Sequence, residues 1–210
     1  MCWGDNLSGQ LGSDPSVDIA PTPISVVGIA SAIAISAGPE HTCVVEGDGT
    51  TRCWGTGDQG ELGDGVSAVS YIPVAVVGIT NAAHIDAGGF VFLIGGDNCV
   101  FDVTGSAWCW GVGNFGQLGD GSSVGSSIPV PVTGLTDAVS ISTGNYHSCS
   151  VTNGGSAWCW GKCEYGQVGP GCAGYSSIPV SVTGLTNLAG ISAGGDHSCA
   201  FSSNGAVWCW

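Results

Sequence analysis

The sequence predicts an all-β protein, a β-propeller of four-stranded blades with about four blades present in a partial or open ring. A Cys-Trp pair recurs along the chain at steps of 51, 56, 50 and 50 residues, and a fixed period of this size is typical of solenoids and propellers. The 38 glycines fit short strands joined by tight turns and disfavour long helices. We therefore expect a single repeat domain, 1–210.

The repeat divides this domain into four units that follow a short leading piece. We place the blade units at 5–55, 56–111, 112–161 and 162–210, and 1–4 as the tail of a preceding blade. In the first unit, β-rich runs predict strands near 24–27, 33–37, 41–45 and 51–54. Proline beside the first run suits an edge strand, because proline cannot donate to the ladder.

The second unit departs from this plan before its hairpin. About six extra residues follow Gly88-Gly89, and the histidine of the other units is absent. We interpret this as an insertion or bulge. Because Cys99 and Cys109 keep their spacing, we expect the hairpin itself to form.

Four pairs of cysteines, each ten residues apart, bracket turn-forming segments. If each segment is a β-hairpin, the two cysteines face each other on adjacent antiparallel strands within bridging distance. Buried reduced thiols are the alternative. Repeated pairing favours an oxidising compartment, and hence an extracellular or cell-surface protein. With a fifth pair inside one loop, the expected disulfides are Cys43–Cys53, Cys99–Cys109, Cys149–Cys159, Cys163–Cys172 and Cys199–Cys209.

Cys2 has no expected partner, because its mate would lie ten residues upstream. Residues 1–5 show neither a basic start nor an apolar run, so no signal peptide is visible. We therefore expect this chain to be an internal fragment of a longer secreted protein.

The charge balance is strongly acidic. Sixteen acidic residues oppose only Arg52 and Lys162, which gives a formal net charge of −14. Phosphate neutralisation requires clustered Lys and Arg, so we expect no nucleic-acid partner. No stretch is long and apolar enough for membrane insertion. The acidity favours solubility or a basic partner.

Several motifs recur in one order in every unit. The clearest copies are Trp110-Gly111 followed by Gly116-Gln117-Leu118-Gly119, and Ile35-Ser36-Ala37-Gly38 followed by His41 and Cys43. This pattern resembles the regulator of chromosome condensation repeat over essentially the whole chain, and the cysteine pairs resemble its secreted bacterial branch. The resemblance implies a β-propeller, usually of seven blades. The name-giving member is a nucleotide exchange factor, and no segment here matches its exchange wedge.

The sequence predicts no catalytic, cofactor or metal site. His41, His147 and His197 each lie two residues before a cysteine, which would allow zinc binding. Because the position repeats, we favour a structural histidine that bonds a neighbouring turn. Asp64-Gly65 and Asp120-Gly121 lack the acidic density of a calcium loop and suit turns.

The remaining candidates are the loops 56–71, 112–127 and 162–177. They vary most between units and carry Tyr71, Phe115, Tyr165 and Tyr175. Aromatic side chains on variable loops over a rigid scaffold are typical of protein recognition, although the loops could merely connect blades. We therefore expect a non-enzymatic scaffold that binds an unidentified protein partner through its loop face. The alternatives are a guanine-nucleotide exchange regulator of a small GTPase and the non-catalytic part of a larger extracellular enzyme.

Overall fold

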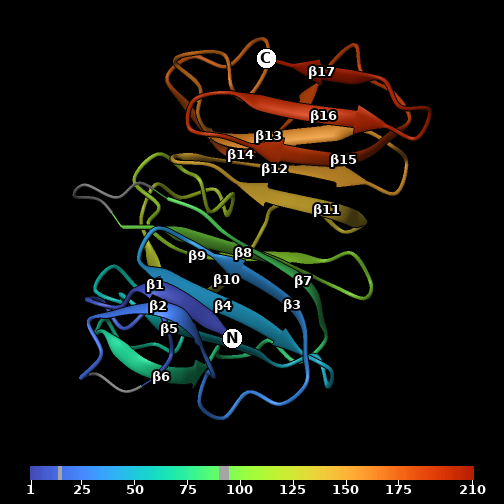
Figure 1. Cartoon of the computed structure of the whole chain (residues 1–210). Coiled ribbons are helices and arrows are strands. Elements are labelled where there is room, and N and C mark those ends of the chain that lie inside the picture. Colours follow the sequence, from blue (N-terminus) through green and yellow to red (C-terminus); the bar gives the residue numbers. More distant parts are fainter. Residues whose placement is uncertain (14–15, 90–94) are drawn as a thin grey trace.

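The computed structural model of the chain describes residues 1–13, 16–89 and 95–210. The described residues form antiparallel β-sheets, with β1 to β6 in the lower half of Figure 1 and the C-terminal strands at the top. Three sheets have four strands, and those at the two ends have two and three. The strands are β1 (Cys2–Asp5), β2 (Ile19–Ile24), β3 (Ala32–Ala37), β4 (His41–Glu46), β5 (Thr51–Gly55), β6 (Ser70–Ala75), β7 (Ala82–Ala87), β8 (Asp97–Asp102), β9 (Ala107–Gly111), β10 (Ser126–Pro131), β11 (Ala138–Thr143), β12 (His147–Thr152), β13 (Ala157–Lys162), β14 (Tyr175–Val182), β15 (Leu188–Ala193), β16 (Ser198–Ser202) and β17 (Val207–Cys209).

The sheets are displaced from the sequence units. The strand order β3-β4-β5-β6 joins three strands of the unit 5–55 to one strand of the unit 56–111, and the next two sheets repeat this arrangement. The loop after β5 returns the chain alongside it, so that Ser70 pairs with Gly55. By contrast, the segment after β2 crosses to the next sheet, and β2 pairs with β1. The boundaries of the sheets therefore fall inside the expected units 5–55, 56–111, 112–161 and 162–210.

Proline occupies outer strands. β6, β10 and β14 each contain a proline and lie at the edge of their sheets, as expected for a residue that lacks the N–H. The strand predicted near 24–27 is wrong in position, because β2 ends at Ile24. After it the backbone turns at Gly28, whose φ is 76°, and Val27 donates its N–H to the Gly12 carbonyl at 3.0 Å.

Four disulfides each join the two strands of one β-hairpin. The register places Cys149 directly opposite Cys159, and their Cα atoms are 4.1 Å apart. The same pairing occurs in the second unit, where β8 and β9 form the expected hairpin. The expected insertion before it falls partly on 90–94, which lie outside the described residues. The five disulfides are those expected from the spacing: Cys43–Cys53, Cys99–Cys109, Cys149–Cys159, Cys163–Cys172 and Cys199–Cys209.

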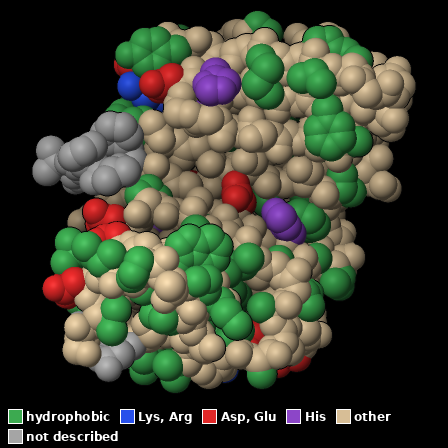
Figure 2. Space-filling model, viewed as in Figure 1, with side chains coloured by type: hydrophobic (Ala, Val, Ile, Leu, Met, Phe, Trp, Pro, Cys, Tyr) green, Lys and Arg blue, Asp and Glu red, His purple; other side chains and the backbone are tan. Residues whose placement is uncertain are grey.

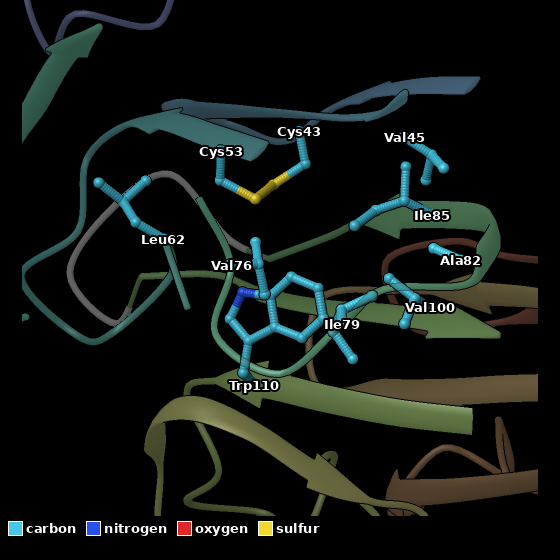
Figure 3. Close-up of a cluster of buried hydrophobic side chains, with 10 residues drawn as sticks. All are labelled: Cys43, Val45, Cys53, Leu62, Val76, Ile79, Ala82, Ile85, Val100 and Trp110. Carbon is cyan, nitrogen blue, oxygen red and sulfur yellow. A yellow bond between two sulfur atoms is a disulfide. The ribbon is translucent and has the colours of Figure 1, made fainter. Parts of the chain in front are cut away.

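The hydrophobic core lies between successive sheets. In Figure 3 the Trp110 indole lies near Val76 and Ile79 of the connection between β6 and β7 and near Val100 of its own sheet, in one cluster with the Cys43–Cys53 disulfide of the preceding sheet. Trp54, Trp110 and Trp160 occupy equivalent positions and are each 0% exposed. In the first described sheet, which has no described sheet before it, the equivalent Trp3 is 65% exposed. Stacking of sheets therefore buries this tryptophan.

A backbone carbonyl links each sheet to the next. Trp160 donates its indole N–H to the Gln117 carbonyl at 2.7 Å, and the Ser148 hydroxyl donates to the same oxygen at 3.0 Å. A glycine follows two residues later because a Cβ at Gly119 would lie 2.8 Å from Trp160 Nε1. The Gly-Gln-Leu-Gly motif is therefore an interface element. The other indole bonds of this kind are Trp54 to Gln10 at 2.9 Å, Trp110 to Glu61 at 2.8 Å and Trp210 to Gln167 at 3.0 Å.

Candidate interaction face

The antiparallel strand order places the long connections at one end of every sheet. We call this end the loop face, and the opposite end, where the hairpins turn, the hairpin face. The predicted loops 56–71, 112–127 and 162–177 thus lie on the same side. Among the described residues, the loop face consists of the connecting segments 6–13, 16–18, 56–69, 112–125 and 163–174 together with the short turns 38–40, 144–146 and 194–197.

Two of the four predicted aromatic residues lie in one cluster. The Phe115 ring packs edge-on against Tyr146, with centroids 5.2 Å apart. The Lys162 ammonium lies over both rings at 5.6 Å and over the Tyr165 ring at 5.2 Å. Cation–π contacts of this geometry are stabilising, and more so when the cation is partly buried. The cluster joins the 112–125 loop, the 144–146 turn and the end of β13. We call Phe115, Tyr146, Lys162, Glu164 and Tyr165 the lysine cluster.

The other two predicted aromatic residues lie outside these ring contacts. Tyr175 begins β14, directly opposite Lys162 in the register, and is 51% exposed. Tyr71 lies in β6, and its hydroxyl donates to the Leu7 carbonyl at 3.2 Å. Tyr71 therefore fixes the loop of the preceding unit to its own sheet.

Sequence reasoning did not assign Lys162 or Tyr146 to this face. Lys162 Nζ lies 3.1 Å from a carboxylate oxygen of Glu164, and the lysine side chain is only 17% exposed. The hydrogen bond to Glu164 raises the pKa of the lysine above its usual value, with partial desolvation acting in the opposite sense. The scarcity of cations in the sequence was a signal that could have identified Lys162, whereas only the fold places Tyr146 beside it.

The loop after Lys162 has covalent and hydrogen-bonded supports. The Cys163–Cys172 disulfide closes it, and Cys163 donates its N–H to the Gly174 carbonyl at 2.9 Å. The Tyr165 N–H donates to the side-chain oxygen of Gln167 at 3.0 Å. These bonds hold the backbone from which the Tyr165 ring projects, and that residue is 66% exposed.

Negative charge gathers on the loop face. In Figure 2, a small basic area at the upper left is bordered by acidic and hydrophobic side chains. The other described cation, Arg52, pairs with Glu46 at 3.0 Å near the hairpin face. The acidic residues at least partly exposed on the loop face are Asp5, Asp18, Glu40, Asp58, Asp64, Asp120, Glu164 and Asp196.

The repeated histidines lie between sheets. His41 Nε2 is 2.9 Å from Asn98 Oδ1, and His147 Nε2 is 2.9 Å from Ser198 Oγ. The expected bond to a turn is thus replaced by a bond to a side chain of the next sheet. Burial lowers the pKa of both histidines to about 4. His197 is exposed, since no described sheet follows it.

Asp97 stands where the other units have histidine. It pairs with Gly111 in the register, as His147 pairs with Gly161. It is 0% exposed, and one carboxyl oxygen accepts a long bond of 3.4 Å from Ser148 Oγ, while the other has no hydrogen-bond partner among the described residues. Burial raises the pKa of this carboxyl well above its ordinary value. The residue therefore weakens the interface it occupies.

Asp97→Asn is expected to stabilise the protein, and more at pH 7.5 than near pH 4. A carboxyl whose folded-state pKa is raised stabilises the fold only while protonated, so wild type loses stability as pH rises above the unfolded value of 3.8. Avoiding the buried charge is worth about 1–3 kcal/mol at neutral pH. His41 and His147 lower stability as pH falls from 6.5 toward 4 in both proteins, so their effect cancels. Urea unfolding at the two pH values measures the gap, and a gap that shrinks with rising pH would contradict this account.

The two Asp-Gly pairs form turns. Asp64 Oδ1 accepts the Val66 N–H and Asp120 Oδ1 accepts the Ser122 N–H, both at 2.9 Å. Such bonds to a residue two positions on are typical of Asx turns. Among the described residues, no group of three or more His, Cys, Asp or Glu is placed to hold a metal ion. No described helix has the length and hydropathy to cross a membrane.

Comparison with known proteins assigns the repeat. The profile of the Regulator of chromosome condensation (RCC1) repeat matches residues 2–45, 104–151 and 154–201, and a second profile of this repeat matches 138–167. The chain is 31% identical to the human E3 ubiquitin-protein ligase HERC2 over 159 residues, which are 71% of this chain and 3% of that protein. It is 29% identical to the Arabidopsis thaliana ultraviolet-B receptor UVR8 over 155 residues, which are 72% of this chain and 34% of the receptor.

Solved structures agree on the architecture. Human WBSCR16 superposes with a TM-score of 0.83 at 18% identity, over 99% of this chain and 55% of that one. Yeast RCC1 (Prp20), solved with Kap60, gives 0.77 at 21% identity, over 92% of this chain and 47% of that one. The stacked four-stranded sheets are therefore part of a β-propeller, which confirms the predicted fold class. The chain belongs to the regulator of chromosome condensation (RCC1) repeat family, and it spans about half the length of these solved relatives.

Proposed function

We propose that the chain is a non-catalytic protein-interaction module that binds a protein partner through its loop face. The observation that carries the proposal is the lysine cluster, in which aromatic rings from separate loops gather around one partly buried cation. Aromatic side chains on a rigid surface are common anchors of protein interfaces. Tyr165 of this cluster and Tyr175, which begins β14, are both more than half exposed and available for contact.

The proposal also assigns the module to a secreted or cell-surface protein of the disulfide-containing branch of the family. Five disulfides fit an oxidising environment, because reducing compartments keep such thiols reduced. Four of them lie inside the β-hairpins and stabilise the scaffold. The fifth lies in the loop that carries Tyr165, where it orders the proposed contact surface.

A pull-down with matched variants tests the loop face. Biotinylated wild type would capture its partner from an extracellular extract, and chemical cross-links would locate the contact. We expect Tyr165→Ala combined with Tyr175→Ala to reduce recovery at least tenfold, since both side chains are exposed and their removal spares the core. Val103→Ala, on the hairpin face and 75% exposed, is the control and should retain full recovery. Equal recovery by both variants would reject the loop face as the binding surface.

A further inference from the structure

The loop 163–174 differs from its equivalents in ways that the fold does not require. The corresponding loops 56–69 and 112–125 contain Gly-x-Leu-Gly where this loop has Gly-Gln-Val-Gly, and they reach this interface segment without a disulfide. At the positions of Cys163 they have Gly57 and Gly113. Since those loops connect their strands without a disulfide, the one here has another role. Cross-linking a loop removes conformational freedom, which favours a surface ordered before it meets a ligand.

The residues that the disulfide orders face a solvated, negatively charged surface. Tyr165 is 66% exposed, and the Glu164 side chain is 56% exposed. Lys162 Nζ lies 3.1 Å from Glu164 Oε2, and the carboxylate is exposed enough to accept a further bond from an external donor. Asp196, exposed on the turn 194–197, holds in its repeat the position of Tyr146, which packs against Phe115, the counterpart of Tyr165. The single positive charge of Lys162 is thus outnumbered by two carboxylates.

Lys162 acts here as an internal support rather than as the recognition group. Its ammonium is enclosed by the three rings and by Glu164, and little of the side chain reaches solvent. Because it contacts residues of two loops and a turn, it fixes the rings relative to one another. What remains outward is one tyrosine ring beside exposed carboxylates.

We infer that the disulfide-closed loop is an anchoring site for an arginine side chain in a basic segment of the partner, an inference that rests on the proposed function. A guanidinium stacks on an aromatic ring while donating to carboxylates, which a tyrosine beside Glu164 and Asp196 provides. Charge complementarity favours this occupant, because the loop face and the whole chain, at −14, are acidic. Glu164 and Asp196 accept from the guanidinium, and the Tyr165 ring covers its plane.

A defined peptide tests this site without the natural partner. The probe is a fluorescein-labelled heptapeptide of alternating glycine and arginine, titrated by fluorescence anisotropy at low ionic strength. We expect wild type to bind it, and Tyr165→Ala and Glu164→Gln each to weaken binding about fivefold or more. Asp58→Asn is the matched control, since Asp58 occupies the position of Glu164 in a loop without a disulfide. It should change the dissociation constant less than about twofold.

Two further measurements make the result decisive. Cys163→Ser with Cys172→Ser should weaken binding while leaving the far-ultraviolet circular dichroism unchanged, because the hairpin disulfides remain. A control peptide in which glutamate replaces every arginine of the probe should not bind. An equal loss in Asp58→Asn and Glu164→Gln would mean diffuse attraction to the acidic face, and absence of binding by wild type would likewise overturn the site. Neither outcome of the peptide titration decides the pull-down, which tests whether the loop face binds a protein partner at all. The arginine site and the proposed function can therefore be rejected independently.

Discussion

Reduction of the disulfides is expected to unfold this protein under conditions in which the oxidised chain is stable. Each hairpin disulfide joins cysteines ten residues apart and stabilises the fold by about 2–3 kcal/mol in the chain-entropy description. Four of them together contribute on the order of 10 kcal/mol, which is comparable with the whole stability of an ordinary domain. Far-ultraviolet circular dichroism during urea titration, with and without reductant, measures the change.

Thiol counting provides the control for this experiment. Native, unreduced protein should show one reactive thiol, from Cys2, and fully reduced protein should show all eleven. A variant with Cys163→Ser and Cys172→Ser loses only the loop disulfide, so it should unfold cooperatively with a loss of about 2–3 kcal/mol, much less than on full reduction. An unchanged midpoint in protein whose eleven thiols are all free would show that packing alone maintains the sheets.

The second large effect is expected from Trp160→Ala, which should destabilise the protein by about 3–5 kcal/mol. Trp160 is 0% exposed in the core between two sheets, and its indole N–H donates to the Gln117 carbonyl at 2.7 Å. The substitution therefore removes a large buried surface, leaves a cavity, and takes one donor from a carbonyl at the interface. Trp160→Phe keeps most of the volume and isolates the lost hydrogen bond, with an expected cost of about 1 kcal/mol from that bond.

Trp3 is the matched control for Trp160. It holds the equivalent position in the Cys-Trp-Gly phrase but is 65% exposed in the first sheet. Trp3→Ala should therefore change the free energy of unfolding by less than about 0.5 kcal/mol. Urea unfolding followed by circular dichroism compares the three variants. Similar losses for Trp3→Ala and Trp160→Ala would refute the conclusion that stacking of sheets gives this tryptophan its energetic weight.

The local features of this fold could be predicted from the sequence. Within a hairpin, Cys149 and Cys159 are brought opposite each other by a short turn, so spacing alone indicates the pairing. Proline in β10 likewise marks an edge strand. The boundaries of the sheets could not be obtained in this way. The pairing of β6 with β5 depends on the loop between them, which returns the chain alongside β5. The sequence period is the same whichever strand is taken as the start of a unit, so the period does not locate the boundaries of the sheets.

The candidate site was predictable only in part, for a related reason. Phe115 and Tyr165 could be singled out as aromatic residues on variable loops. Their common neighbour Lys162 brings together the loops of two successive units and a short turn, so their contact depends on how the sheets stack. Tyr71 is also an aromatic residue of a predicted variable loop, but its hydroxyl donates to the Leu7 carbonyl, because its strand lies beside the preceding loop. The sequence indicates which residue types the loops carry, but it does not indicate which residues of different units lie close together.

The displacement between units and sheets bears on how such a chain can change in length. Each of the three four-stranded sheets takes its last strand from the following copy, so neighbouring copies interlock. A gene duplication or deletion that joins equivalent points of two copies restores every strand taken in this way, wherever in the period the junction falls. The number of repeats can therefore increase or decrease by whole units without leaving an unpaired strand at the junction.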